Sequence, residues 1–177
     1  SMGPKNVELT AELAEGWAPF FLRPESAQDV WGDALAAGFA KRDASLPPLD
    51  TMVPVNVAIG DDVDHLIDAM RPMLALYIGG MGAKGANFYH HLATRSGFGE
   101  AADTIQDLYL AGNKAEAEAA VPAELAKSVS LIGDAGYVKD RIAAFREVGV
   151  TTFMANPTQE SHEQRVATRS ALADLIA

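Results

Sequence analysis

The stretch 51–59, TMVPVNVAI, decides the fold class of this chain, because a helical pattern follows it directly from about Asp61 to Tyr77. Its valine-rich composition is typical of a buried strand, which Pro54 weakens without abolishing. A buried strand that leads into a helix is the repeating unit of an α/β fold with a parallel sheet. The helix has Asp61 or Asp62 as its expected N-cap.

The same alternation extends in both directions from this stretch. Proline at position 4 suits the first turn of a helix, and Gly133-Asp134 begins an amphipathic one. We expect Pro72 to kink the helix that follows the central strand. The other expected elements are a helix from Gly3-Pro4 to Gly16, a buried strand 17–22, a helix from Pro24 to about Lys41, the helix from Gly133 to about Val148, a strand 151–155 and a helix 163–176.

Residues 79–130 interrupt this order with a helical excursion, in which Gly79-Gly80, Ser96-Gly97 and Pro122 are the breaks. Only three strands are legible in the sequence, and the first helix has no strand before it. Three parallel strands cannot close a barrel, and such a sheet would expose two edges. We expect a single domain over 1–177 whose sheet is incomplete.

The composition excludes several classes of function. The chain has 177 residues, a formal net charge of −10 and 14 scattered basic residues, which argues against a nucleic-acid partner. It has no cysteine, so disulfides, thiolate catalysis and cysteine-ligated zinc are excluded. No apolar run approaches the roughly 20 residues of a membrane span. Without a visible secretory signal, we expect a cytoplasmic protein.

Three groups of sequence strings resemble the luciferase-like monooxygenase family, in particular its deazaflavin (coenzyme F420)-dependent oxidoreductases from actinobacteria. The strings 71–82 (RPMLALYIGGMG) and 87–89 (NFY) are the most distinctive. The others are GPKN at 3–6 with AELAEGW at 11–17, and LIG at 131–133 with VKDR at 138–141 and GVTT at 149–152.

The resemblance implies an α/β fold, namely a partial (β/α)8 TIM barrel: about strands six to eight with their helices plus the excursion. It also implies the C-terminal portion of an oxidoreductase that uses deazaflavin, or alternatively FMN, for hydride transfer or monooxygenation of a small organic substrate. Groups from the early strands have no counterpart here, so we expect the chain to be inactive alone, and its catalytic residues stay unassigned.

Gly3, Pro4 and Lys5 are the candidate cofactor-binding residues. A helix N-terminus presents unpaired N–H groups and a partial positive charge to a phosphate, and Lys5 adds a full charge. In the family this loop lies at the cofactor-bearing face, so the resemblance implies a contact with the coenzyme's phosphate or tail. The alternative is an ordinary helix start with a solvated lysine.

Other polar motifs favour structural roles. Residues 79–85 (GGMGAKG) lack the ending of a phosphate-binding P-loop, so we interpret them as a helix end and turn. The Asp61-Asp62-x-Asp64 motif lacks the glycine and distal glutamate of a calcium loop, which favours helix capping. Adjacent histidines on a helix point about 100° apart, so no metal site is expected from the four histidines His65, His90, His91 and His162.

The remaining candidate site residues are aromatic side chains and the segment after the last predicted strand. Asn156-Pro157 follows the last predicted strand, where a turn is favoured over a substrate contact. Phe20 and Phe21 lie near the end of a strand, where one could line the mouth of a barrel. The default role is core packing for all five of Trp17, Phe20, Phe21, Trp31 and Phe39.

A different class of function is an assembly module without catalysis, which dimerises through its open sheet. An uncovered sheet should not stay monomeric in water. A second copy, giving a homo-oligomer, or the missing barrel half would cover it, unless residues 79–130 fold over the sheet instead.

Overall fold

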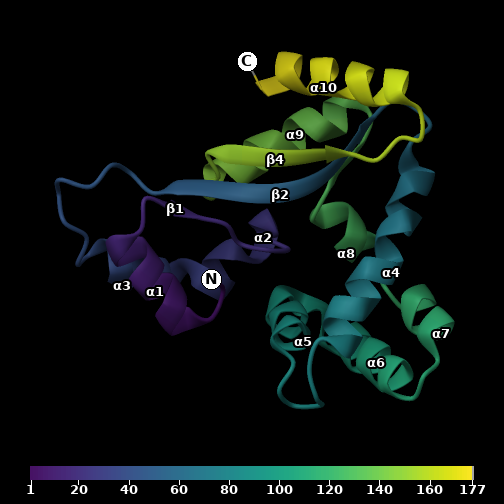
Figure 1. Cartoon of the computed structure of the whole chain (residues 1–177), viewed down its shortest axis with the longest axis horizontal. Helices are drawn as coiled ribbons and strands as arrows, with labels where there is room; N and C mark the ends of the chain where they lie inside the picture. The colour runs from purple at the N-terminus through teal and green to yellow at the C-terminus, as the bar shows by residue number, and fades with distance from the viewer. Residues whose placement is uncertain (177) are drawn as a thin grey trace.

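The computed structural model describes residues 1–176 and shows a parallel sheet with β2 (Asp50–Ile59) at its centre (Figure 1). One edge of β2 pairs with β4 (Thr152–Pro157), from Met52 opposite Thr152 to Val57 opposite Pro157. The short strands β1 (Gly16–Trp17) and β3 (Leu131–Gly133) also pair with β2, at its start and its end. The α/β class and the parallel sheet are therefore confirmed.

The strand predicted over 17–22 is wrong beyond Trp17. In the register that pairs Trp17 with Thr51, continued pairing would bring Pro19 and Pro54 into the ladder, and neither has an N–H to donate. The chain instead turns at Phe21, whose φ of 56° lies in the left-handed region. β3 was not predicted, because three residues are too short to show an alternating pattern.

Helices fill the intervals between the strands. Most bounds fall within a few residues of those predicted, and the π-helical turns η1, η3 and η4 lie inside longer helical stretches. The helical elements are α1 (Pro4–Leu13), α2 (Pro24–Ala27), η1 (Gln28–Gly32), α3 (Asp33–Phe39), η2 (Asp64–Met70), α4 (Arg71–Ala75), η3 (Leu76–Gly80), α5 (Phe88–Ala93), η4 (Thr94–Phe98), α6 (Gly99–Leu110), α7 (Lys114–Ala119), α8 (Ala123–Ser128), α9 (Ala135–Glu147) and α10 (His162–Ile176).

The helix after β2 begins differently from the prediction. Its N-cap is Val63, and no side chain caps it, so the assignment of Asp61 or Asp62 as the cap is wrong. Near Pro72, where a kink was predicted, the structure shows a change of helix type: the 3-10 helix η2 ends at Met70, and the α-helix α4 begins with Arg71-Pro72. Proline fits there because the first turn needs no N–H donor.

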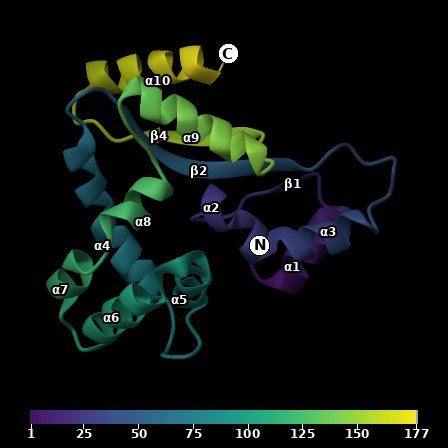
Figure 2. The ribbon, with the colours of Figure 1, turned by 180° about the vertical axis from the view of Figure 1, so that it is seen from behind.

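The two faces of the sheet have different surroundings. Val53, Val55 and Val57 are buried in a core that includes Ile142 and Phe145 of α9. Met52, Pro54 and Asn56, which alternate with these valines, are only partly buried, and Met154 of β4 is 54% exposed. Accordingly α9 lies behind β2 and β4 in Figure 1 and in front of them in Figure 2. The sheet thus has one covered face and one open face.

Residues 64–128, which we call the helical lobe, follow the carboxyl end of β2 and lie below the sheet in Figure 1, where they form a second hydrophobic core that also includes Ala58 of β2 and Ile132 of β3. In this core η3 packs closely on α6, because a Cβ at Gly79 would lie 2.5 Å from the Cβ of Tyr109. The predicted reading of the glycine-rich segment as a helix end is confirmed, since η3 ends at Gly80. The lobe borders the open face of the sheet without covering Met154.

Three further corrections concern single residues. Phe39, expected in the core, is 47% exposed, because it lies in the last turn of α3. Asn156 and Pro157, expected in a turn, are the last two residues of β4. Within residues 1–176, no helix has both the length and the hydropathy needed to cross a bilayer.

Candidate functional site

A hollow of about 390 Å³ lies against the open face of the sheet, between β2, β4 and the helical lobe. We call it the sheet hollow. Its walls are almost entirely apolar, and three of the chain's methionines contribute to them. The lining residues are Phe20, Phe21, Pro54, Val55, Asn56, Met70, Met73, Val129, Met154, Ala155 and Asn156.

The polar side chains in this wall are the amides of Asn56 and Asn156, which the register of β2 and β4 places opposite each other. The Nδ2 of Asn156 donates to the Oδ1 of Asn56 at 2.9 Å. This single bond leaves further donors on both amides and the Oδ1 of Asn156 as an acceptor. The pair therefore offers donor and acceptor groups at one point of an apolar surface.

Phe20 and Phe21 form an aromatic section of the wall of the sheet hollow. Their rings form a cluster with Tyr77 and Tyr89, with ring centroids between 4.2 and 6.3 Å apart. Burial, and then the neighbouring Tyr77, raise the pKa of the Tyr89 hydroxyl, so Tyr89 is a neutral hydrogen-bonding group near neutral pH. Both phenylalanines line the sheet hollow, although they lie in a loop after β1 rather than near the end of a strand.

Phe20 also lines a second hollow, of about 380 Å³, together with Gly3, Ala18 and Tyr89. We call it the N-terminal hollow. The backbone N–H of Phe20 donates to the Sδ of Met2 at 3.2 Å, which fixes this loop beside the start of α1. The two hollows therefore share Phe20 as a common wall.

Of the predicted site residues, Gly3 lines the N-terminal hollow, whereas Pro4 and Lys5, the first two residues of α1, are not among its lining residues. Gly3 is the N-cap, no side chain caps the helix, and its first turn contains no acidic residue. A Cβ at Gly3 would meet no atom within 4 Å, so the space in front of the turn is open. An uncapped helix start beside an exposed lysine fits an anionic group such as a phosphate.

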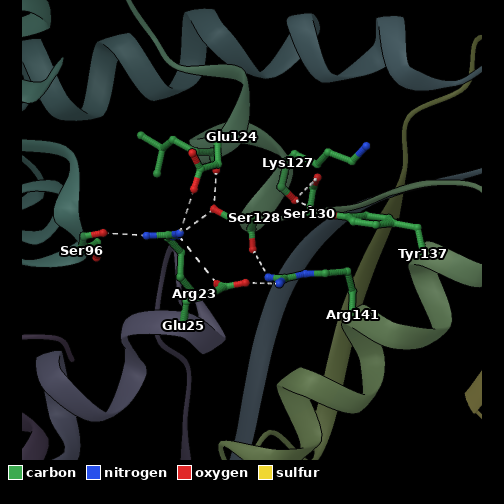
Figure 3. Close-up of polar contacts among 10 residues, drawn as sticks. Arg23, Glu25, Ser96, Glu124, Lys127, Ser128, Ser130, Tyr137 and Arg141 are labelled. Atoms are coloured by element: carbon green, nitrogen blue, oxygen red, sulfur yellow. Dashed lines mark hydrogen bonds and ion pairs between the residues drawn. The ribbon is translucent and has the colours of Figure 1, made fainter.

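A buried polar network fixes the loop that carries Phe20 and Phe21 (Figure 3). The guanidinium of Arg23, only 7% exposed, donates to the carbonyl of Ser96 at 2.6 Å and to the Oγ of Ser128 at 2.8 Å. It also lies 4.6 Å from the ring centroid of Phe98. Arg23 thereby ties the end of the β1 loop to two parts of the helical lobe.

Arg141 of α9 completes this network, donating to the carbonyl of Ser128 at 2.6 Å and to the carboxylate of Glu25. Burial lowers the pKa of Arg23, which nevertheless stays a cation. Burial would raise the pKa of Glu25, but the hydrogen bond from Arg141 and the nearby positive charges outweigh it and hold that pKa below its usual value. The network joins the loop after β1 and α2 to α9 and the lobe.

Other sequence candidates have local partners. His90 bonds to the carboxylate of Asp103 at 2.9 Å, and His91 lies 3.3 Å from the carbonyl of Gly85. Asp64 pairs with Lys127 at 3.6 Å. Over residues 1–176 the structure shows no group of three or more histidine or acidic side chains positioned to hold a metal ion.

The sequence reasoning missed Arg23, Tyr77, Tyr89 and Asn56. A signal for Asn56 was present, because Met52, Pro54 and Asn56 alternate with valines in the central strand. This period-2 pattern indicates a strand with two different faces rather than one that is buried on both. The contacts of Arg23 with residues far along the chain have no local signal.

Comparisons with known proteins agree on one family. Residues 1–152 match the family model for luciferase-like monooxygenase. A protein of Mycobacterium tuberculosis (strain ATCC 25618 / H37Rv), named as the coenzyme F420-dependent oxidoreductase Rv3520c, is 35% identical over 164 residues. That alignment covers 92% of this chain and 46% of the relative. The chain thus spans about half the length of the curated relative that it matches.

Two solved structures share the fold. The coenzyme F420-dependent tetrahydromethanopterin reductase from Methanopyrus kandleri matches with a TM-score of 0.70 at 21% identity, over 95% of this chain and 46% of that one. An F420-dependent secondary alcohol dehydrogenase, in complex with an F420-acetone adduct, matches with a TM-score of 0.67 at 14% identity, over 100% and 47% of the two chains. At these identities the likeness concerns the fold alone.

Proposed function

Because this chain belongs to the luciferase-like monooxygenase family, we propose that it forms part of a deazaflavin-dependent oxidoreductase that moves a hydride to or from a small organic substrate. The observation that carries this proposal is the pair of hollows with Phe20 as their common wall. One hollow begins at an uncapped helix start, and the other is apolar. In this account the open sheet is one section of a barrel wall, strands six to eight.

The N-terminal hollow is the proposed site for the anionic tail of the coenzyme. The first turn of α1 would bind the phosphate through its free N–H groups, and Lys5 would add a positive charge. The close packing of α1 on α3 holds this turn in place, because Gly38 approaches the backbone of Glu8. The name of the mycobacterial relative supports deazaflavin over FMN as the coenzyme.

The sheet hollow is the proposed section of the substrate pocket. When bound, the coenzyme would supply the hydride chemistry, while the chain's residues bind, orient and exclude water. Phe20 and Phe21 exclude water from the side of the N-terminal hollow, and the Asn56–Asn156 pair gives the wall a polar point for orientation. No group of this chain is assigned to proton transfer.

Coenzyme binding tests the proposal without depending on turnover. Calorimetric titration of coenzyme F420 into the chain should give binding that weakens about tenfold in Lys5→Ala, since a charge-assisted contact to phosphate contributes roughly 1.5–3 kcal/mol at most. Lys139→Ala removes an exposed lysine on α9 and is the matched control. Equal affinity in wild type and Lys5→Ala would contradict the role of α1.

We expect the chain alone to be inactive, because the proposed barrel section provides one wall of the site. Turnover of any acceptor by the isolated chain with reduced coenzyme would contradict this part of the proposal.

A second candidate function is assembly through the open face of the sheet. The 54% exposure of Met154 favours it, because this side chain continues the apolar wall of the sheet hollow, and a contiguous exposed apolar surface is typical of an interface. A second copy of the chain, or the complementary part of a barrel, would cover this face. Light scattering tests it: a monomer at high concentration contradicts self-association.

A further inference from the structure

We infer that the sheet hollow selects uncharged, largely apolar substrates that carry one group able to donate and accept hydrogen bonds. This inference rests on one part of the proposed function, namely that the sheet hollow is the substrate site. It concerns the section of wall that this chain provides.

The first observation is the charge of the wall. Among the described residues that line the hollow, none is an aspartate, glutamate, lysine, arginine or histidine. A charged ligand group placed against this wall would lose water without gaining a counter-charge, which costs far more than the burial of an apolar group gains. Ionised substrates are therefore disfavoured whatever the sign of their charge.

The second observation is the flexibility of the apolar surface. Met70 and Met73 come from the helix after β2, and Met154 comes from β4, so methionines face the hollow from two sides. Methionine side chains are unbranched and polarisable, and they adapt to ligands of different outline. Such a wall recognises apolar character rather than one precise shape.

The third observation is the single polar point in the wall. Asn156 donates to Asn56 at 2.9 Å, and the remaining donors and the Oδ1 of Asn156 stay available. Because the hydrogen bond between the two amides fixes their relative orientation, a donor and an acceptor stand side by side. An amide or hydroxyl group of a ligand can bind to both.

Four compounds of nearly the same outline isolate these effects: benzamide is neutral and polar, benzoate is an anion, benzamidinium is a cation, and α-methylstyrene has no polar group. Binding is read from the methyl resonances of the six methionines in the isotope-labelled chain. Met70, Met73 and Met154 line the hollow, whereas Met81 is 51% exposed outside it and serves as the internal control.

The expected result is that benzamide shifts the resonances of Met70, Met73 and Met154 and leaves Met81 unchanged. Benzoate and benzamidinium should both bind at least about tenfold more weakly. Weak binding of the cation excludes simple repulsion by the net charge of −10 as the cause. Benzamide should bind about fivefold more tightly than α-methylstyrene.

Variants test the amide pair. Asn156→Leu should abolish the preference for benzamide over α-methylstyrene, and Asn56→Leu should do the same if one of the two variants is unstable. Asn113→Leu, which makes the same change at an exposed position before α7, should retain the preference.

The inference is overturned if either ion binds as well as benzamide, if Met81 shifts together with the lining methionines, or if the amide variants keep the preference. The coenzyme titration with Lys5→Ala tests the proposed function separately. Coenzyme binding without discrimination among the four compounds would contradict the inference alone, and discrimination without coenzyme binding would contradict the proposed function alone.

Discussion

Arg23 donates a hydrogen bond from its Nε to the Oγ of Ser128 at 2.8 Å, across a sequence separation of 105 residues. The bond connects the loop after β1 with the end of α8. Since Phe20 and Phe21 lie on this loop and Val129 directly follows Ser128, the contact fixes two sides of the sheet hollow relative to each other.

Arg23→Gln should lower the free energy of unfolding by about 2–4 kcal/mol, because it leaves buried acceptors and the Glu25 carboxylate with fewer partners. Urea denaturation followed by circular dichroism measures this. Arg169→Gln, the same change at an exposed position of α10, should alter stability by less than about 0.5 kcal/mol. Equal stability of the two variants would show that the network contributes nothing.

Glu25 should make stability depend on pH. Its folded-state pKa is lowered below the unfolded value of about 4.3, so its contribution is fully present above that value and is lost as the pH falls through the folded pKa. The urea midpoint of the wild type should therefore fall more steeply below about pH 4.3 than that of Glu25→Gln. If the urea midpoints of the two proteins changed in parallel with pH, the contribution of the Glu25 ion pair to stability would be refuted.

Gly38→Ala should destabilise the contact between α1 and α3 by about 2–3 kcal/mol, since a Cβ there would lie 2.2 Å from the carbonyl oxygen of Glu8. Gly99→Ala is the matched control, because its Cβ would meet a Thr94 methyl at 3.4 Å and the helix α6 should gain about 0.5 kcal/mol. Thermal unfolding distinguishes the two effects, because the melting temperature should fall in Gly38→Ala and rise in Gly99→Ala. If both substitutions changed the stability equally, α1 would be free to move away from a Cβ at position 38 of α3.

Met154→Lys tests whether the open face associates. If two copies bury this face, the substitution places an unpaired charge in the interface and should shift the protein toward monomer in light scattering. Val166→Lys, at a 45% exposed position of α10, should leave the association unchanged. A wild type that is already monomeric would leave only the catalytic proposal.

The fold was predictable where local patterns determine it. The valines of 51–59 predicted the central strand, and the helix expected from Gly133-Asp134 is present as α9, where Asp134 accepts from the N–H of Tyr137 at 2.8 Å. The sequence did not predict how short β1 is, because its length depends on which residues of β2 it pairs with. Trp17 and Trp31 were expected in the core, and they pack there with ring centroids 5.5 Å apart.

The site was less predictable than the fold. The helix start beside the N-terminal hollow could be anticipated from a proline in its first turn, whereas the hollow itself brings together distant residues such as Gly3, Phe20 and Tyr89. The sheet hollow could not, because Phe20, Met70 and Asn156 come together only through the sheet register and the Arg23 contacts. Residues brought together by tertiary contacts have no common pattern along the chain.

We propose that the two hollows form one site on either side of Phe20. Titration of coenzyme F420 into the methionine-labelled chain tests it most directly, because Met2 lines the N-terminal hollow while Met73 and Met154 line the sheet hollow. We expect all three methyl resonances to shift with one binding constant while that of Met81 stays unchanged. A shift at Met2 without shifts at Met73 and Met154, or no shift at Met2, would contradict it.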